Sequence, residues 1–248
     1  MKKAVIATTI LASSNTLHEK VRGACALKML YSAVEHGYEV VVIDGGSPTW
    51  FIRAMNELRG VYVYDQEVPG MGNARRQALR VAREHAKDGY AIVWTEPEKY
   101  PLIAELEPAV SKLVDEEHDL VMLQRLSLES YPPEQAKAYE LIALAVKYLT
   151  GIESDFGWGP TVLSSKAVEY YLNYNSQHGD LWDGIHCPKL QIIKDGLRWA
   201  IVCVNYHHPP EQTAAETGMN LFLKRIKQVD QLVRAIEQEV DRLQMRVQ

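Results

Sequence analysis

The sequence predicts an α/β protein with a mostly parallel sheet flanked by helices and a long C-terminal helix. From residue 4 to residue 149, short apolar runs typical of buried strands alternate with segments whose apolar residues recur at helical spacing. Three of the predicted strands are followed by turns rich in glycine or acidic residues. Because ligands bind at the carboxyl ends of the strands in an open parallel sheet, we expect function at these turns.

The predicted elements of the first part of the chain follow one another with short connections. Thr16-Leu-His-Glu19 has the spacing of a capping box, so a helix is predicted to start there and to end near residue 35. Ser47 before Pro48 predicts the start of a second helix, which runs through Leu58. The strands are predicted at residues 4–9, 39–44, 61–65, 90–95 and 119–124, and the other helices at 72–87, 103–114 and 134–149.

After Gly151 the alternation becomes less regular. Strands are predicted at 161–163 and 199–204, and helices at 166–172 and 180–195. One long helix is predicted from Met219 to the end, within an appended segment of residues 216–248, and it either docks on the domain or pairs with a second copy as a homodimer. Its apolar stripe recurs at spacings of three and four residues: Leu223, Ile226, Val229, Leu232, Val233, Ile236, Val240 and Leu243.

The composition argues against several classes of protein. The 248 residues are 47% hydrophobic and 24% charged, which fits one large globular domain. A net charge of −5 argues against nucleic-acid binding, and no apolar run approaches the roughly 20 residues of a membrane span. The first residues resemble a signal peptide, but a buried first strand is the favoured interpretation. Three well-separated cysteines predict a reducing, cytoplasmic location: Cys25, Cys187 and Cys203.

The turns after the second, third and fourth strands carry complementary chemistry. Asp44-Gly-Gly-Ser47 offers a carboxylate, and Pro69-Gly-Met-Gly-Asn-Ala-Arg-Arg76 offers glycines and paired arginines at a helix start. Thr95-Glu-Pro-Glu98 offers two more carboxylates. A helix N-terminus with arginines favours phosphate, and carboxylates are ligands for magnesium or manganese. Together these turns predict a site for a nucleotide diphosphate and a divalent metal.

In this order the segments resemble the GT-A fold of nucleotide-sugar glycosyltransferases, especially the family-two-like group and small enzymes of the mannosylglycerate-synthase type. The resemblance covers residues 3–212 and depends on the order of the motifs more than on any single one. It implies a catalytic domain at residues 1–215, with a nucleotide-binding half at 1–124 and an acceptor half at 125–215. It also implies transfer of a sugar from a UDP- or GDP-linked donor to a small polar acceptor, with Mn²⁺ or Mg²⁺ as the cofactor.

The resemblance places the nucleotide donor at the ends of the first strands. Asp44 would contact the base or ribose, and the glycines of its turn would let the backbone approach closely. At the glycine-led start of the third helix, free backbone N–H groups and the helix dipole would favour the diphosphate. One of the two following arginines would add phosphate contacts, and Arg75 is slightly favoured over Arg76. The implied donor-binding residues are Thr8, Thr9, Asp44, Gly70, Gly72, Arg75 and Arg76.

The implied metal ligands follow the fourth and the last strand. Glu96 and Glu98 stand where the family has its Asp-x-Asp motif, and their longer side chains shift the expected metal position. Some members add a histidine after the last strand, where this chain has His207 and His208. Since adjacent strand residues face opposite sides, only one of these histidines is expected to point inward.

The acceptor half contains two further motifs. Gly157-Trp-Gly-Pro160 resembles the loop that walls the sugar or acceptor pocket, and Arg125 and Tyr131 are candidates for contacts with an anionic or polyol acceptor. The implied substrate-binding residues are Gly157, Trp158, Gly159, Arg125 and Tyr131.

The catalytic carboxylate is expected in the segment Gly179–His186. An inverting transferase needs a base within hydrogen-bond reach of the acceptor hydroxyl. Asp183 is the predicted base and Asp180 the second choice, although either could instead cap a helix.

Two alternative functions remain open at this point. A sugar-nucleotide pyrophosphorylase shares the nucleotide-binding half, but the first loop Ile10–Asn15 lacks the glycines of such enzymes. A sugar-nucleotide-binding or assembly module without transferase activity would explain glutamates in the metal motif and the coiled-coil-like tail.

Overall fold

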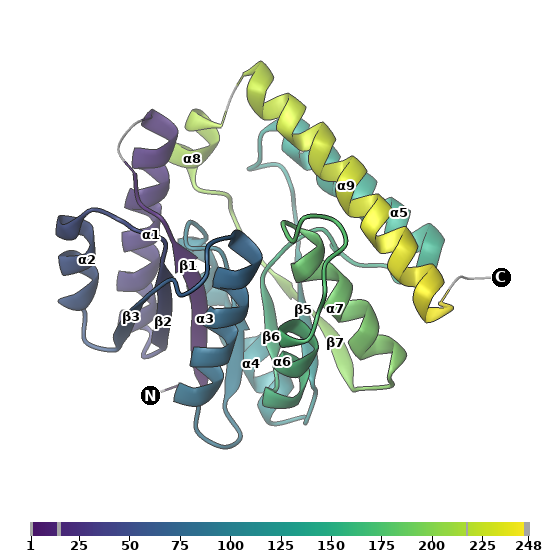
Figure 1. Cartoon of the computed structure of the whole chain (residues 1–248), viewed down its shortest axis with the longest axis horizontal. Helices are drawn as coiled ribbons and strands as arrows, with labels where there is room; N and C mark the ends of the chain where they lie inside the picture. Colours follow the sequence, from purple (N-terminus) through teal and green to yellow (C-terminus); the bar gives the residue numbers. More distant parts are fainter. Residues whose placement is uncertain (1, 14–15, 217, 246–248) are drawn as a thin grey trace.

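A single seven-stranded sheet organises the chain (Figure 1). The structure, a computed structural model, describes residues 2–13, 16–216 and 218–245. The strands lie in the order β3-β2-β1-β4-β6-β5-β7. Their bounds are β1 (Ala4–Ile10), β2 (Glu39–Asp44), β3 (Val61–Asp65), β4 (Ala91–Trp94), β5 (Leu120–Arg125), β6 (Thr161–Leu163) and β7 (Trp199–Val204). The α/β fold with a mostly parallel sheet is therefore confirmed.

The short strand β6 is the one described strand that runs against its neighbours. It pairs antiparallel with both β4 and β5, whereas β1, β2, β3 and β4 form a continuous parallel set. Because Thr161 is paired with Trp94, the amino end of β6 meets the carboxyl end of β4. The loop before β6 is thereby brought to the ligand-binding edge of the sheet.

Helices cover both faces of the sheet. The helices before β6 are α1 (Leu17–Glu35), α2 (Thr49–Asn56), α3 (Met71–His85), α4 (Glu107–Val114) and α5 (Pro133–Thr150), with the 3₁₀ turn η1 (Tyr100–Glu105). Those after β6 are α6 (Ser165–Leu172), α7 (Asp183–Lys194), α8 (Pro210–Ala215) and α9 (Met219–Leu243). One core packs α1, α2, η1 and α4 on the sheet, and the other packs α3, α6, α7 and α9 on its opposite face. None of these described helices is both long and apolar enough to cross a membrane.

The start of α1 confirms the predicted capping box. The Thr16 hydroxyl accepts from the Glu19 backbone N–H at 3.2 Å, and the Glu19 carboxylate accepts from the Thr16 N–H at 3.0 Å. The predicted cap of the second helix was wrong, because α2 has Pro48 at its N-cap and no side-chain cap. Instead, the Ser47 hydroxyl accepts from the Ala12 N–H at 2.8 Å and ties two loops of the sheet edge together.

The C-terminal helix α9 docks on the rest of the chain. Its buried apolar residues Leu232, Ile236 and Val240 belong to the core that also contains α5 and α7. Figure 1 shows α9 lying along α5. Leu223 and Ile226, nearer its start, are 47% and 50% exposed. The second part of the stripe is buried against the domain in this structure, while pairing with another copy stays a prediction.

Candidate active site

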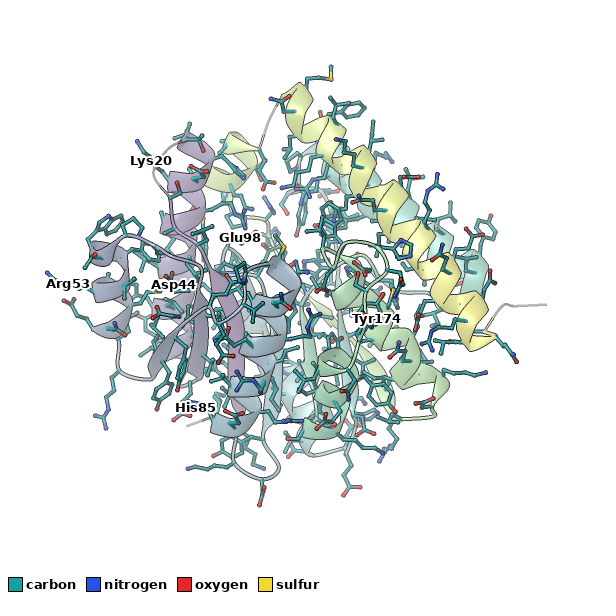
Figure 2. The ribbon with its side chains drawn as sticks, viewed as in Figure 1. Lys20, Asp44, Arg53, His85, Glu98 and Tyr174 are labelled. Carbon is teal, nitrogen blue, oxygen red and sulfur yellow. The ribbon has the colours of Figure 1, made fainter. Side chains whose placement is uncertain are left out.

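The carboxyl ends of the parallel strands bring the predicted site segments to one edge of the sheet. Asp44 ends β2, and Glu98 lies four residues beyond the end of β4. Figure 2 labels both side chains, whereas His85, at the end of α3, lies near the opposite edge. Since β1 lies between β2 and β4, the two acidic turns flank the end of β1.

The Asp44 carboxylate stabilises the turn in which Asp44 lies. One of its carboxylate oxygens accepts from the backbone N–H groups of Gly46 and Ser47, at 2.9 and 2.8 Å. The other oxygen has no protein partner, and neither has the buried hydroxyl of Thr8. Thr9 is half-buried beside them. A buried polar atom without a partner is costly, so these two atoms mark a place for a polar ligand.

A carboxylate of the protein lies against the first turn of α3. No side chain caps this helix, and Gly70 precedes it with φ +111°. The Asp180 carboxylate lies directly on Gly72, where any Cβ atom would overlap it. Arg76 donates to the same carboxylate at 2.6 Å. This helix start therefore has the electrostatics of an anion site.

The two arginines have different surroundings. Arg75 is 8% exposed and donates to the Leu181 carbonyl oxygen, and burial lowers its pKa to about 10. The Arg76 side chain is 25% exposed and faces Asp180. A small pocket lies between α3 and α7 and is lined by both arginines and Trp94. Arg76, and not the favoured Arg75, is thus the more accessible of the pair.

The predicted metal ligands do not converge. Both oxygens of Glu98 accept from the Arg22 guanidinium at 3.3 Å. Glu96 lies against Gly159 and is 3.7 Å from the Lys99 ammonium. Among the described residues, no group of three or more histidine, cysteine, aspartate or glutamate side chains could hold a metal ion. In this conformation the residues present do not fit the implied Mn²⁺ or Mg²⁺ site.

His208 is the inward-facing member of the histidine pair. It is 3% exposed, its Nδ1 lies 2.8 Å from the Thr213 hydroxyl, and its Nε2 lies 3.8 Å from Glu216. Burial, reinforced by the nearby Lys99 charge, lowers the pKa of His208 to about 3, so its imidazole is neutral. His207 is exposed.

Asp183, the predicted base, is enclosed by hydrogen-bond donors. It is 2% exposed, and one oxygen accepts from the hydroxyls of Tyr174, at 3.2 Å, and Ser176. Its other oxygen accepts from the Leu181 N–H at 3.2 Å. This carboxylate therefore orders the loop before α7, and its catalytic role stays a prediction. The Asp180 and Glu96 side chains are 24% and 26% exposed.

The candidate acceptor residues lie mostly inside the protein. Arg125 forms a buried ion pair with Asp155, and its guanidinium is 4.6 Å from the ring centre of Tyr131 and 5.0 Å from that of Trp158. Tyr131 and Trp158 are 4% and 1% exposed. A Cβ at Gly157 would press on Ile142, and one at Gly159 would overlap Glu96. In this conformation these residues shape the wall behind the strand ends.

Three basic residues near the site escaped the sequence prediction. Arg22 lies on α1, and its pairing with a glutamate 76 positions away has no local signal. Lys99 follows the acidic motif directly, so its position was available as a signal. Lys189 on α7 is 1% exposed and donates to the Trp158 carbonyl oxygen at 3.1 Å. Burial lowers the pKa of Lys189 to about 8.

Comparisons with known proteins place this fold. No protein-family model and no curated protein matches the chain. Glucosyl-3-phosphoglycerate synthase from Mycobacterium tuberculosis, in its complex with UDP, superposes with a TM-score of 0.63 at 14% identity, over 98% of this chain and 81% of that one. Its complex with Mn²⁺, UDP-glucose and phosphoglyceric acid gives 0.61 at 16%, over 98% and 80%.

Mannosyl-3-phosphoglycerate synthase from Rubrobacter xylanophilus gives a TM-score of 0.60 at 13% identity, over 99% of this chain and 76% of that one. At such identities the likeness concerns the fold alone. The chain has the GT-A fold of nucleotide-sugar glycosyltransferases.

Proposed function

We propose that this protein is a glycosyltransferase that moves a sugar from a UDP- or GDP-linked donor to a small polar acceptor. The observation that carries the proposal is the anion site at the start of α3. There Arg76 donates to the Asp180 carboxylate, which lies against Gly72 in the first turn of a helix that no side chain caps. A donor diphosphate carries more negative charge than a carboxylate, so it would exchange with Asp180 at Arg76.

The proposed donor pose uses the orphaned polar atoms at the end of the sheet. With the diphosphate at α3, the nucleoside would lie over the ends of β1 and β2, where Thr8 and Asp44 each keep a polar atom without a partner. Leu11 and Met71 are 68% and 52% exposed on the adjoining segments and offer apolar surface to the base.

In the transfer, the bond between the anomeric carbon and the diphosphate oxygen breaks, and its electron pair leaves with the diphosphate. The acceptor oxygen bonds to the anomeric carbon, and its proton passes to a carboxylate. We assign that proton to Asp180, because the diphosphate would release it from Arg76 and Asp183 is enclosed. Phosphoglyceric acid, which the mycobacterial enzyme binds, is the first acceptor to test.

Titration of UDP and GDP into the protein tests the donor site. Arg76→Gln should weaken binding by about 1.5–3 kcal/mol, the range for hydrogen bonds to charged groups. Arg53→Gln is the matched control, because Arg53 is exposed on α2 and points away from the sheet (Figure 2). Binding of neither nucleotide, or equal titrations for both variants, would reject the proposed site.

A second candidate is a sugar-nucleotide-binding module without transfer. The engagement of Glu98 by Arg22, which leaves the acidic motif without a free carboxylate pair, favours it. Both candidates predict nucleotide binding, so the discriminating measurement is product formation from UDP-glucose or a GDP-linked sugar. Binding without transfer or donor hydrolysis would support the module.

A further inference from the structure

We propose that Arg22 supplies the positive charge that a divalent metal supplies elsewhere, so that this chain binds a nucleotide diphosphate without a metal ion. The inference rests on the proposed function, because it concerns the same donor. The acidic motif resembles a metal site in sequence, whereas its glutamates contact Arg22 and Lys99 in the structure.

The Arg22 guanidinium binds the two Glu98 oxygens that a metal ion would need as ligands. Both carboxylate oxygens accept from its Nη2 at 3.3 Å, and the Glu98 side chain is 11% exposed. A metal that used these oxygens would have to displace an arginine from an ionised, largely buried carboxylate, which is costly.

The charge balance at the acidic motif disfavours a divalent ion. Glu96 and Glu98 bring two negative charges, and Arg22 and Lys99 bring two positive ones at 3.3 and 3.7 Å. In a metal motif the negative charge of the carboxylates is normally balanced by the bound ion. Here the motif is already neutralised, so an added Mn²⁺ would meet no net negative charge.

Arg22 also keeps donors that Glu98 does not use. Its side chain is 45% exposed, whereas that of Glu98 is 11% exposed. Both contacts with Glu98 come from Nη2, so the Nε and Nη1 groups are not engaged by that carboxylate. A planar guanidinium with several donors suits phosphate oxygens.

Arg22 lies close enough to His18 and Lys224 for its charge to disfavour the protonated form of each. Burial and the Arg22 charge lower the pKa of His18, one turn away on α1. Desolvation and the charges of Arg225 and Arg22 lower the pKa of Lys224 on α9. The Nδ1 atom of His18 is buried and has no hydrogen-bond partner. Arg22 and Lys224 repel each other, so an anion between them would be attracted by both, while His18, whose pKa is lowered, stays neutral and can offer a hydrogen bond.

The test is calorimetric titration of UDP and GDP into the full chain, once with excess EDTA and once with Mn²⁺. Wild-type dissociation constants should agree within about threefold between the two conditions. Arg22→Gln should weaken binding at least about tenfold in both, as expected for a lost hydrogen bond to a charged group. Lys20→Gln is the control, because Lys20 is exposed on the same helix and removal of its charge should change nothing (Figure 2).

Each outcome has a separate meaning. Binding that requires Mn²⁺, or binding that Arg22→Gln leaves intact, overturns the role of Arg22 while the proposed function stands. Absence of nucleotide binding in both conditions overturns the proposed function together with the inference. If Arg22→Gln does not fold, the wild-type comparison with and without EDTA and the Arg22→Lys variant, which should keep metal-independent binding, decide the question.

Discussion

Asp183 shows how a single carboxylate can satisfy a catalytic motif and still be structural. Three donors, from Tyr174, Ser176 and the Leu181 backbone, surround a side chain that is 2% exposed. A base that draws a proton from an acceptor must itself be within reach of that acceptor. The geometry therefore favours a role in holding the loop before α7.

The variant Asp183→Asn tests this role. The amide would turn its NH₂ group toward a donor, so we expect the free energy of unfolding to fall by about 1–3 kcal/mol. Urea unfolding measures the loss, and Asp88→Asn, at an exposed carboxylate, is the control. An unchanged unfolding curve together with a roughly 10²-fold loss of turnover would instead support Asp183 as the base.

At the residue scale, the sequence could identify positions but not pairings. Glu96, Glu98 and the arginines after Gly72 lie at the carboxyl edge as predicted, because their place follows from the strands before them. The pairing of Glu98 with Arg22 joins residues 76 positions apart. The contact of Arg76 with Asp180 spans 104 positions. Neither leaves a local pattern, so the expectation of a metal site could not be checked from the sequence.

At the element scale, features that depend on neighbouring residues were predicted, and features that depend on contacts with distant segments were not. The capping box of α1 lies within four residues and was predicted. The predicted cap by Ser47 was wrong, because the Ser47 hydroxyl accepts from the Ala12 N–H of another loop. The direction of β6 is set by β4 and β5, and its three residues carry no signal of direction. The helix α8 was not among the predicted elements, and it starts directly after Pro209.

Docking of α9 can be tested by the same substitution, isoleucine to alanine, at a buried and at an exposed position of this helix. Ile236→Ala removes a side chain that is 0% exposed in the core and should cost about 2–5 kcal/mol. Ile226→Ala, at a position that is 50% exposed, should change stability by less than about 0.5 kcal/mol. Urea unfolding of both variants measures the difference. Equal losses would mean that the first part of the stripe is buried in solution, as pairing with another copy predicts.

At the scale of the whole molecule, the proposed donor site lies at the carboxyl edge of the sheet, and helix-to-strand connections lie at the amino edge. The segments 8–12, 66–72 and 95–99 lie at the carboxyl edge, and 86–90, 115–119 and 195–198 connect helices to strands at the other edge. Arg22 on α1 and Arg76 on α3 approach the carboxyl edge from opposite faces of the sheet. A donor that contacts both would link the two cores.

Hydrogen exchange with and without UDP tests this placement of the donor. Amides that exchange by global unfolding should slow everywhere, since a ligand at 100 times its dissociation constant stabilises the native state by about 2.7 kcal/mol. Fast-exchanging loop amides respond only where the ligand restricts local motion. We therefore expect slower exchange in the carboxyl-edge segments and unchanged fast exchange in the amino-edge loops. Protection confined to the amino-edge loops would place the nucleotide away from Arg22, Arg76 and Asp44, and would contradict the donor site.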